Sequence, residues 1–351
     1  MNQENHLNNK KIRVLVNGYG VIGKRVADAV VLQDDMELVG VSDISLDYRI
    51  KIAQTQNYKI FSSTQESMDT MRAAGVVVDG LLDDALKISD IVVDATPKGI
   101  GAKNKVIYDA AGVKSIFQGG ESHDFTGVSF VAQANYQDAL KKDSVRCVSC
   151  NTTGLVRVVN ALHSKGLVKK VRATLLRRGT DPWESHKNGL INTVEPEKSI
   201  PSHQGPDVMT IIPNLDISTI AVAGPFNLSH LHTVFIELTK EVSKQEIIKI
   251  YKDTPRIALI KKSEGVEALN STIEIMRDIK RPRNDMWEVA LWEDILEVSG
   301  TELMLVYQVH NEAIVIPENI DAIRALSGTQ KEAEKSIQKT DESLGIKKYF
   351  Y

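Results

Sequence analysis

The sequence predicts an α/β fold class, in which a doubly wound parallel sheet is joined to an α+β domain with a mixed or antiparallel sheet. In the first part of the chain, short apolar runs alternate with amphipathic stretches, as in βαβ units. Later in the chain the strand-like runs are longer and long polar connections separate them, which is typical of an α+β domain. The 351 residues are enough for two cores. We expect residues 1–149, completed by helices within residues 311–351, to form the first domain and residues 150–310 the second.

The first strand and helix enclose a glycine-rich turn. An apolar run at residues 12–16 is followed by this turn and then by an amphipathic stretch at residues 24–32. Gly18, Gly20 and Gly23 match Gly-x-Gly-x-x-Gly in the strand–turn–helix context that dinucleotide binding requires. Glycines in a tight turn can also serve packing alone, so the motif needs further support.

That support comes from the second apolar run. Residues 37–43 end at Asp43, which lies 20 positions after Gly23. A carboxylate at this position accepts hydrogen bonds from an adenosine ribose and repels a 2′-phosphate. The strand, the glycines and Asp43 together predict a Rossmann-type domain that binds NAD or NADP, with NAD favoured by Asp43.

The remaining elements follow the same two patterns. The first domain continues with buried-type strands at residues 90–97, 115–118 and 145–148. A helix is expected between the first two of them, at residues 103–112. Long strands then follow at residues 170–178, 217–222, 230–238 and 303–309, with one helix at residues 244–252. Two amphipathic segments close the chain, at residues 319–326 and 329–344. Because a parallel sheet needs helices on both faces, we expect this tail to pack back on the first sheet.

Composition excludes several functional classes. The formal net charge is −3, so nucleic-acid binding is not expected. No apolar run has transmembrane length, and the polar N-terminus lacks the apolar region of a secretory signal. The chain has two cysteines, too few for a disulfide framework. We expect a cytoplasmic protein with no membrane partner.

Cys150 is the candidate nucleophile. It lies between the strand at residues 145–148 and a periodic, helix-like run, where the positive end of a helix dipole favours a thiolate. Cys147 and Cys150 form a C-x-x-C pair, but Cys147 falls inside the apolar strand. We interpret Cys147 as a small buried hydrophobic residue rather than a redox partner.

Basic and histidine side chains could complete the site. Arg177 and Arg178 end a predicted strand and are able to bind a phosphate or carboxylate, or to form ordinary ion pairs. His230 and His232 alternate on one strand face. No third ligand stands at a recognisable spacing, so we expect no metal site. One histidine is a candidate base for Cys150, and a structural role is the alternative for either.

The chain resembles the archaeal-type (class II) glyceraldehyde-3-phosphate dehydrogenases. The resemblance covers nearly the whole chain after the first ten residues, and it rests on collinear segments at residues 16–30, 99–104, 117–121, 149–155, 177–182, 201–208, 254–256 and 316–322. It implies NAD(P)-dependent, phosphorylating oxidation of D-glyceraldehyde 3-phosphate to 1,3-bisphosphoglycerate in glycolysis or gluconeogenesis. It also implies inorganic phosphate as co-substrate and a cytoplasmic homotetramer.

The resemblance assigns roles to individual residues. The nucleophile falls on Cys150 and the catalytic base on His230. We expect Cys150 to form a hemithioacetal and then a thioester. We expect His230 to donate to the oxyanion as imidazolium as well. Cofactor contacts fall on Val21, Ile22, Gly120, Arg178 and Asn311. Substrate contacts fall on Ser149, Asn151, His203, Gln204 and Gly205. Arg177 or Arg178 and Thr152 or Thr153 are candidates to hold the two phosphates, without assignment to separate sites.

Three positions depart from the family pattern. Gln204 replaces a second histidine, Asn311 replaces a glutamine, and Asp43 stands where several members carry lysine. Two other functions stay open from the residues alone. One is a related semialdehyde or acyl-phosphate dehydrogenase, which shares the thiol and the histidine. The other is a non-catalytic NAD-binding regulator, in which Cys150 would be unreactive.

Overall fold

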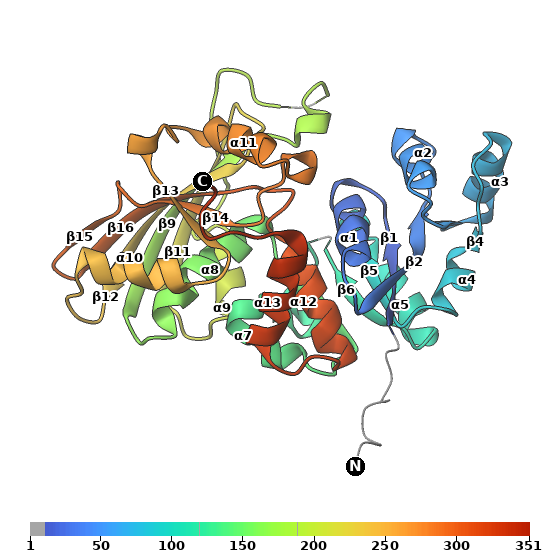
Figure 1. Ribbon diagram of the computed structural model, residues 1–351, viewed down its shortest axis with the longest axis horizontal. Coiled ribbons are helices and arrows are strands. Elements are labelled where there is room, and N and C mark those ends of the chain that lie inside the picture. The colour runs from blue at the N-terminus through green and yellow to red at the C-terminus, as the bar shows by residue number, and fades with distance from the viewer. Residues whose placement is uncertain (1–10, 119, 188) are drawn as a thin grey trace, which may run out of the picture. The chain divides into compact units, whose positions relative to one another are not determined.

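The computed structural model describes residues 11–118, 120–187 and 189–351, so the polar N-terminus and Gly119, in the family-like segment at residues 117–121, lie outside the described residues. The chain forms two compact units. The first unit contains residues 11–128, 136–147 and 316–344, and the second contains residues 129–135, 148–315 and 345–351. Figure 1 shows the elements of each unit.

The first sheet is doubly wound, as the sequence predicts. Its strand order is β4-β3-β2-β1-β5-β6-β8-β7, and the pairs from β4 to β8 are parallel. The chain order reverses between β1 and β5, which is where such sheets bind ligands. The elements are β1 Ile12–Asn17, α1 Val21–Val31, β2 Met36–Asp43, α2 Tyr48–Thr55, β3 Ile60–Ser62, α3 Gln65–Ala73, β4 Gly80–Leu81, α4 Leu82–Leu86, β5 Ile91–Asp94, α5 Gly101–Ala110, β6 Lys114–Phe117, α6 His123–Thr126, β7 Ser129–Phe130, α7 Ala132–Ala139 and β8 Ser144–Cys147.

The C-terminal helices α12 (Ile316–Ser327) and α13 (Ala333–Leu344) complete the first unit. The fully buried Arg324 of α12 donates from Nε to Asp35 Oδ2 at 2.8 Å and from Nη1 to Thr340 Oγ1 at 2.6 Å. Asn319 accepts a 2.8 Å hydrogen bond from Gln118, at the end of β6. The expectation that the tail packs back on the first sheet is therefore confirmed.

The second unit is built on a mixed sheet of order β10-β11-β9-β12-β16-β14-β13, with β15 pairing β16. The β9–β11 and β13–β14 pairs are parallel, and β12 is antiparallel to both β9 and β16. Its elements are α8 Cys150–His163, β9 Val168–Arg178, η1 Pro182–Glu184, β10 Glu195–Pro196, α9 Gln204–Met209, β11 Ile217–Gly224, β12 His230–Leu238, α10 Lys244–Asp253, β13 Ile257–Ile260, η2 Lys262–Glu264, α11 Leu269–Asp278, η3 Pro282–Asn284, β14 Val289–Trp292, β15 Glu297–Ser299 and β16 Glu302–Val309.

The compact units differ from the expected boundaries in four segments, at residues 129–135, 148–149, 311–315 and 345–351. Residues 129–135 belong to the second unit, where Gln133 donates to the Pro255 carbonyl at 2.6 Å. Residues 345–351 also belong to it, because Phe350 packs into an apolar cluster with Met276 and Trp292. Neither anchor has a local signal in the sequence.

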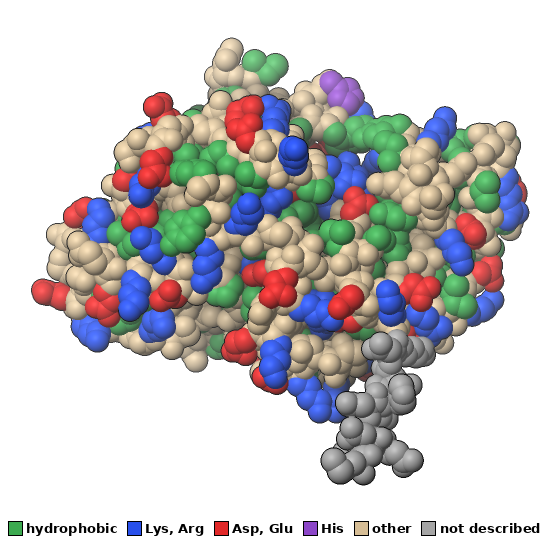
Figure 2. Space-filling model, in the orientation of Figure 1, with side chains coloured by type: hydrophobic (Ala, Val, Ile, Leu, Met, Phe, Trp, Pro, Cys, Tyr) green, Lys and Arg blue, Asp and Glu red, His purple; other side chains and the backbone are tan. Residues whose placement is uncertain are grey.

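The surface carries charges of both signs. On the face shown in Figure 2, Lys and Arg side chains are interspersed with Asp and Glu, in keeping with the formal net charge of −3. Among the described residues, no helix is long and apolar enough to cross a bilayer.

Candidate active site

Cys150 is the first residue of α8, directly after strand β8 and a two-residue link. Ser149 is the N-cap, and its hydroxyl accepts the Thr152 backbone N–H at 3.3 Å. A serine cap satisfies one of the unpaired N–H groups of the first turn and fixes where the helix begins. The predicted strand-to-helix junction at Cys150 is confirmed.

Gly154 lets the start of α8 approach the sheet closely. A Cβ atom at this position would lie 2.5 Å from Val309 Cγ1 of β16, which is far closer than atoms can pack. One turn further along, Arg157 is fully buried and donates to the Trp287 and Ile314 carbonyls at 2.7 and 2.9 Å. The helix carrying Cys150 is therefore held against β16, the strand that pairs with the histidine-bearing β12.

His230 is the histidine that reaches the thiol. Its Nε2 lies 3.4 Å from Cys150 Sγ, and its Nδ1 accepts the Arg178 backbone N–H at 3.1 Å. Because a backbone N–H can only donate, Nδ1 carries the lone pair and the neutral ring carries its proton on Nε2. A base at Nε2 would need the opposite tautomer, so this geometry supports His230 as a hydrogen-bond donor toward Sγ.

Burial controls the protonation of both groups. Desolvation raises the pKa of the Cys150 thiol, although Arg178, Arg177 and the Asn151 backbone N–H lower it. The expectation that the helix terminus favours a thiolate is therefore wrong for the ligand-free protein, because desolvation outweighs these groups. Burial also lowers the pKa of His230 well below its usual value, and the cationic Arg178 and Arg177 act in the same direction. The expected imidazolium is therefore disfavoured.

Arg178 and Asn311, both expected at the cofactor, share one carboxylate. Arg178 pairs with Asp181 Oδ1 at 2.5 Å, and Asn311 Nδ2 donates to the same oxygen at 3.2 Å. Asp181 raises the pKa of Cys150, whereas Arg178 lowers it. The structure brings these two predicted residues together through Asp181.

A second carboxylate joins two of the expected substrate residues. Glu197 forms an ion pair with Arg177, and its Oε2 lies 3.6 Å from His203 Nδ1. The neighbouring Gln204 is fully buried, and neither of its amide atoms has a hydrogen-bond partner among the described residues. Gly205 donates its N–H to Thr219 Oγ1 at 3.1 Å. Arg177 and the 203–205 segment thus lie on either side of Glu197.

The hydroxyl groups of Thr152 and Thr153 make hydrogen bonds at the start of α8. Both residues are fully buried. Thr152 Oγ1 lies 3.0 Å from Ser149 Oγ, and Thr153 Oγ1 donates to the Val148 carbonyl at 3.5 Å. Their expected role in binding phosphate stays a prediction, and these hydrogen bonds show how each hydroxyl is held at the start of α8.

The glycine turn of the first unit fits a dinucleotide. Gly18 has φ +92°, and a Cβ there would lie 2.8 Å from the Ala95 carbonyl carbon. Gly20 is the N-cap of α1 and makes no side-chain cap, so the first N–H groups of the helix, including those of Val21 and Ile22, remain for an anion. A Cβ at Gly23 would lie 1.8 Å from the Gly18 carbonyl oxygen. These are the packing roles that the motif requires.

Asp43 lies beside this turn. Its Oδ2 accepts the Tyr19 N–H at 2.7 Å and its Oδ1 accepts the Ser45 N–H at 2.7 Å, which fixes the carboxylate and leaves lone pairs on both oxygens. Gly120 has φ +81° and open space around its missing Cβ. Arg49, which forms an ion pair with Asp47, places Nη1 3.7 Å from the Cβ position of Gly20.

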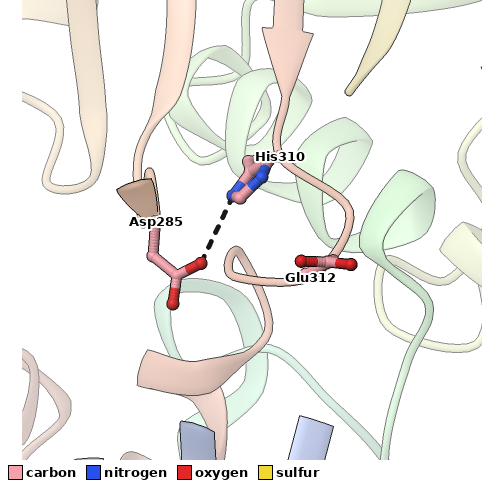
Figure 3. Close-up of side chains that lie close together, drawn as sticks. All are labelled: Asp285, His310 and Glu312. Carbon is pink, nitrogen blue, oxygen red and sulfur yellow. Dashed lines mark ion pairs between the residues drawn. The ribbon is translucent and has the colours of Figure 1, made fainter. Parts of the chain in front are cut away.

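A further cluster of polar side chains lies at the end of β16 (Figure 3). Asp285, His310 and Glu312 have potential ligand atoms within 4.8 Å of one another. The nitrogen facing Asp285 is His310 Nδ1, at 3.8 Å, and it accepts the Met286 N–H at 3.4 Å. The cluster adjoins Asn311, because His310 and Glu312 flank that residue in the chain.

Three side chains of the site were not predicted from the sequence: Asp181, Glu197 and Tyr307. Asp181 stands in the run Arg177-Arg178-Gly179-Thr180-Asp181, whose turn-forming composition was a usable signal. Glu197 stands in a long polar connection, and nothing in its local sequence marks it. Tyr307 faces His232 across the β12–β16 pairing, which only strand register reveals.

Comparison with known proteins gives concordant results. Residues 149–294 match the family model described as "Glyceraldehyde 3-phosphate dehydrogenase, C-terminal domain". A protein of Pyrococcus furiosus named glyceraldehyde-3-phosphate dehydrogenase is 47% identical, over 96% of this chain and 100% of its own length. Relatives with the same name are 46% identical in Thermococcus kodakarensis and 43% identical in Methanococcoides burtonii, covering 100% and 99% of their lengths and 96% of this chain.

Proposed function

The chain belongs to the glyceraldehyde-3-phosphate dehydrogenase family, and from this premise we propose that it oxidises glyceraldehyde 3-phosphate with a nicotinamide cofactor through a thioester on Cys150. The observation that carries the assignment of the site is the contact between Cys150 Sγ and His230 Nε2 at 3.4 Å, at the N-terminus of α8. This places a thiol and an N–H donor together, as acyl transfer through a thioester needs.

The first step is attack of the Cys150 thiolate on the aldehyde carbon. A C–S bond forms, and the carbonyl π electrons move onto oxygen to give a hemithioacetal alkoxide. The Nε2–H of His230 faces the sulfur and is therefore available to the new oxygen. A fixed donor stabilises charge that develops there. Because the thiol proton has already left to solvent and the reaction starts from the thiolate, no base has to remove a proton from the alkoxide.

In the second step the C–H bond breaks and its electron pair leaves as hydride, while the oxygen lone pair re-forms a carbonyl. The product on Cys150 is a thioester. When bound, the oxidised nicotinamide supplies the hydride acceptor. Inorganic phosphate then attacks the thioester carbon and gives up its proton to solvent, the C–S bond breaks to regenerate the Cys150 thiolate, and 1,3-bisphosphoglycerate leaves. Arg177 is the candidate to hold a phosphate, which would take the place of Glu197 at its guanidinium group.

For the cofactor we propose NAD in preference to NADP, held by Gly18, Gly20, Val21, Ile22 and Gly23. The support is the fixed carboxylate of Asp43 beside the turn, which repels a 2′-phosphate. The cationic Arg49 near Gly20 is available to offset part of this repulsion. Some use of NADP is therefore expected.

We also propose that the enzyme works in the cytoplasm as a homotetramer. Ile220 of β11 and Phe235 of β12 expose 43% and 53% of their surface on the second sheet, which is suited to a subunit contact. The particle mass in solution tests the tetramer, and a monomeric mass would contradict it.

The proposed reaction is tested by initial rates with glyceraldehyde 3-phosphate. Formation of the reduced cofactor in repeated turnovers should require inorganic phosphate, because only phosphate releases the acyl group from Cys150. A matched screen with a semialdehyde and with an acyl phosphate distinguishes the related dehydrogenases. Turnover that does not depend on phosphate, or no turnover with this aldehyde, would contradict the proposed function.

Cofactor preference is tested by Asp43→Asn. The variant should lose about tenfold in kcat/KM with NAD, because a charged acceptor of the ribose hydroxyls becomes neutral, and it should gain activity with NADP. Asp84→Asn is the control, because it removes the same charge from an exposed position on α4. An unchanged ratio of NADP to NAD activity would show that Asp43 does not set the preference.

A further inference from the structure

His232 lies two residues beyond the histidine at the thiol, on the same face of β12, and it is fully buried. Its Nδ1 is 2.8 Å from the Tyr307 hydroxyl, and its Nε2 is 2.8 Å from Asn151 Oδ1. Strand register produces the first contact, since His232 is paired with Tyr307 of β16. The start of α8 produces the second, because Asn151 directly follows Cys150. These contacts connect the sheet to the residue beside the nucleophile.

The direction of the two hydrogen bonds can be worked out. Burial lowers the pKa of His232 to about 3, so the ring is neutral and carries one proton. Tyr307 is fully buried, and burial raises its pKa well above the usual value, so it keeps its O–H. If that O–H donates to Nδ1, then Nε2–H donates to Asn151 Oδ1, and all three groups are satisfied. The reverse arrangement would leave the Tyr307 O–H without an acceptor among the described residues, which is costly for a buried donor.

This direction fixes the orientation of the Asn151 amide. Its oxygen is bound to His232, so the Nδ2 end retains both of its donors for another acceptor. No other hydrogen bond of this side chain is found among the described residues. Asn151 is 4% exposed, so the amide cannot turn without losing a buried contact.

We propose that His232, held by Tyr307, is a positioning residue that keeps the amide nitrogen of Asn151 directed at the oxygen of the substrate bound to Cys150. The proposal rests on the proposed function, because it needs an alkoxide on Cys150. Asn151 then acts as a second donor to this oxygen beside His230. His232 touches neither the thiol nor the substrate, and it acts through Asn151 alone.

The decisive comparison is between His232→Gln and His232→Asn. A glutamine amide nitrogen takes about the position of Nε2 and retains the donor to Asn151, whereas asparagine reaches only about the position of Nδ1. His232→Asn should lower kcat/KM for the aldehyde about 10- to 100-fold, and His232→Gln should restore most of it. The rate of alkylation of Cys150 by iodoacetamide should be unchanged in both variants, because Sγ contacts His230 and not His232. Equal losses in the two variants, or none in His232→Asn, would overturn the proposal.

A double variant tests whether His232 acts through Asn151. Adding His232→Asn to Asn151→Ala should cause no further loss beyond about twofold, because the group being positioned is already gone. Losses that multiply would overturn the proposal. If His232→Asn does not give a cooperative melting transition, Tyr307→Phe tests the same series of hydrogen bonds from Tyr307 through His232 to Asn151. This variant removes only one hydroxyl. It should lower kcat/KM several-fold, and full activity would overturn the proposal. Loss of phosphate-dependent turnover in the wild type refutes the proposed function instead, so the two failures are distinguishable.

Discussion

The Cys150→Ser variant should lose at least about 10⁴-fold in the rate of aldehyde oxidation while it still binds the cofactor. The reason is the leaving group: a serine ester would react with phosphate far more slowly than a thioester, and a serine hydroxyl ionises far less readily than a thiol. The dinucleotide turn at Gly18 to Gly23 belongs to the first unit, and Cys150 belongs to the second. Fluorescence titration with the reduced cofactor should therefore give a dissociation constant within a few-fold of the wild type.

Cys147→Ser is the matched control for this variant. Cys147 is 5% exposed, and burial raises the pKa of its thiol well above the usual value. A thiol in such surroundings is unreactive, so the control should keep activity within a few-fold. Mass spectrometry after iodoacetamide treatment should find the label on Cys150 alone. Phosphate-dependent turnover retained in Cys150→Ser would remove the thioester from the mechanism.

Local patterns in the sequence were sufficient for the elements that surround the two sites. The turn at Gly18, Gly20 and Gly23 was predictable because close packing excludes any side chain at Gly18 and Gly23. The junction at Cys150 was predictable because an apolar strand and a periodic helix meet at it. Very short elements, such as β3 at Ile60–Ser62 and β4 at Gly80–Leu81, were missed, since two or three residues carry no recognisable period.

The interior of the site depends on tertiary placement, which the sequence does not reveal. Alternation put His230 and His232 on one face, but the position of α8 decides that His230 meets the thiol and His232 meets Asn151. The upward shift in the pKa of Cys150 arises from desolvation by neighbours distant in the sequence. Tyr307 enters the site through strand pairing, and Glu197 directly follows the paired strand β10. These features need the register of the second sheet.

His230→Ala should slow hydride transfer by about 10²–10³-fold, the usual effect of removing one fixed donor from a developing oxyanion. The proton on Nε2 follows from the Arg178 N–H bonded to Nδ1, and this arrangement separates two roles. A donor is partly replaced by glutamine, whose amide N–H takes about the position of Nε2, whereas a base is not. Single-turnover formation of the reduced cofactor should therefore be faster in His230→Gln than in His230→Ala. Equal rates in these two variants would favour the base.

The pH dependence gives an independent test of the same role. Because desolvation raises the pKa of Cys150, the thiolate fraction near neutral pH grows about tenfold for each unit of pH. Alkylation and oxidation should rise together with that slope in the wild type. His230 has a pKa held well below its usual value, so its ring is already neutral above pH 6. It therefore adds no second titration to the pH–rate profile. The slope should survive in His230→Gln, because it belongs to the thiol. A pH dependence of oxidation that is present in the wild type but absent in His230→Gln would show that His230 exchanges the proton during the reaction.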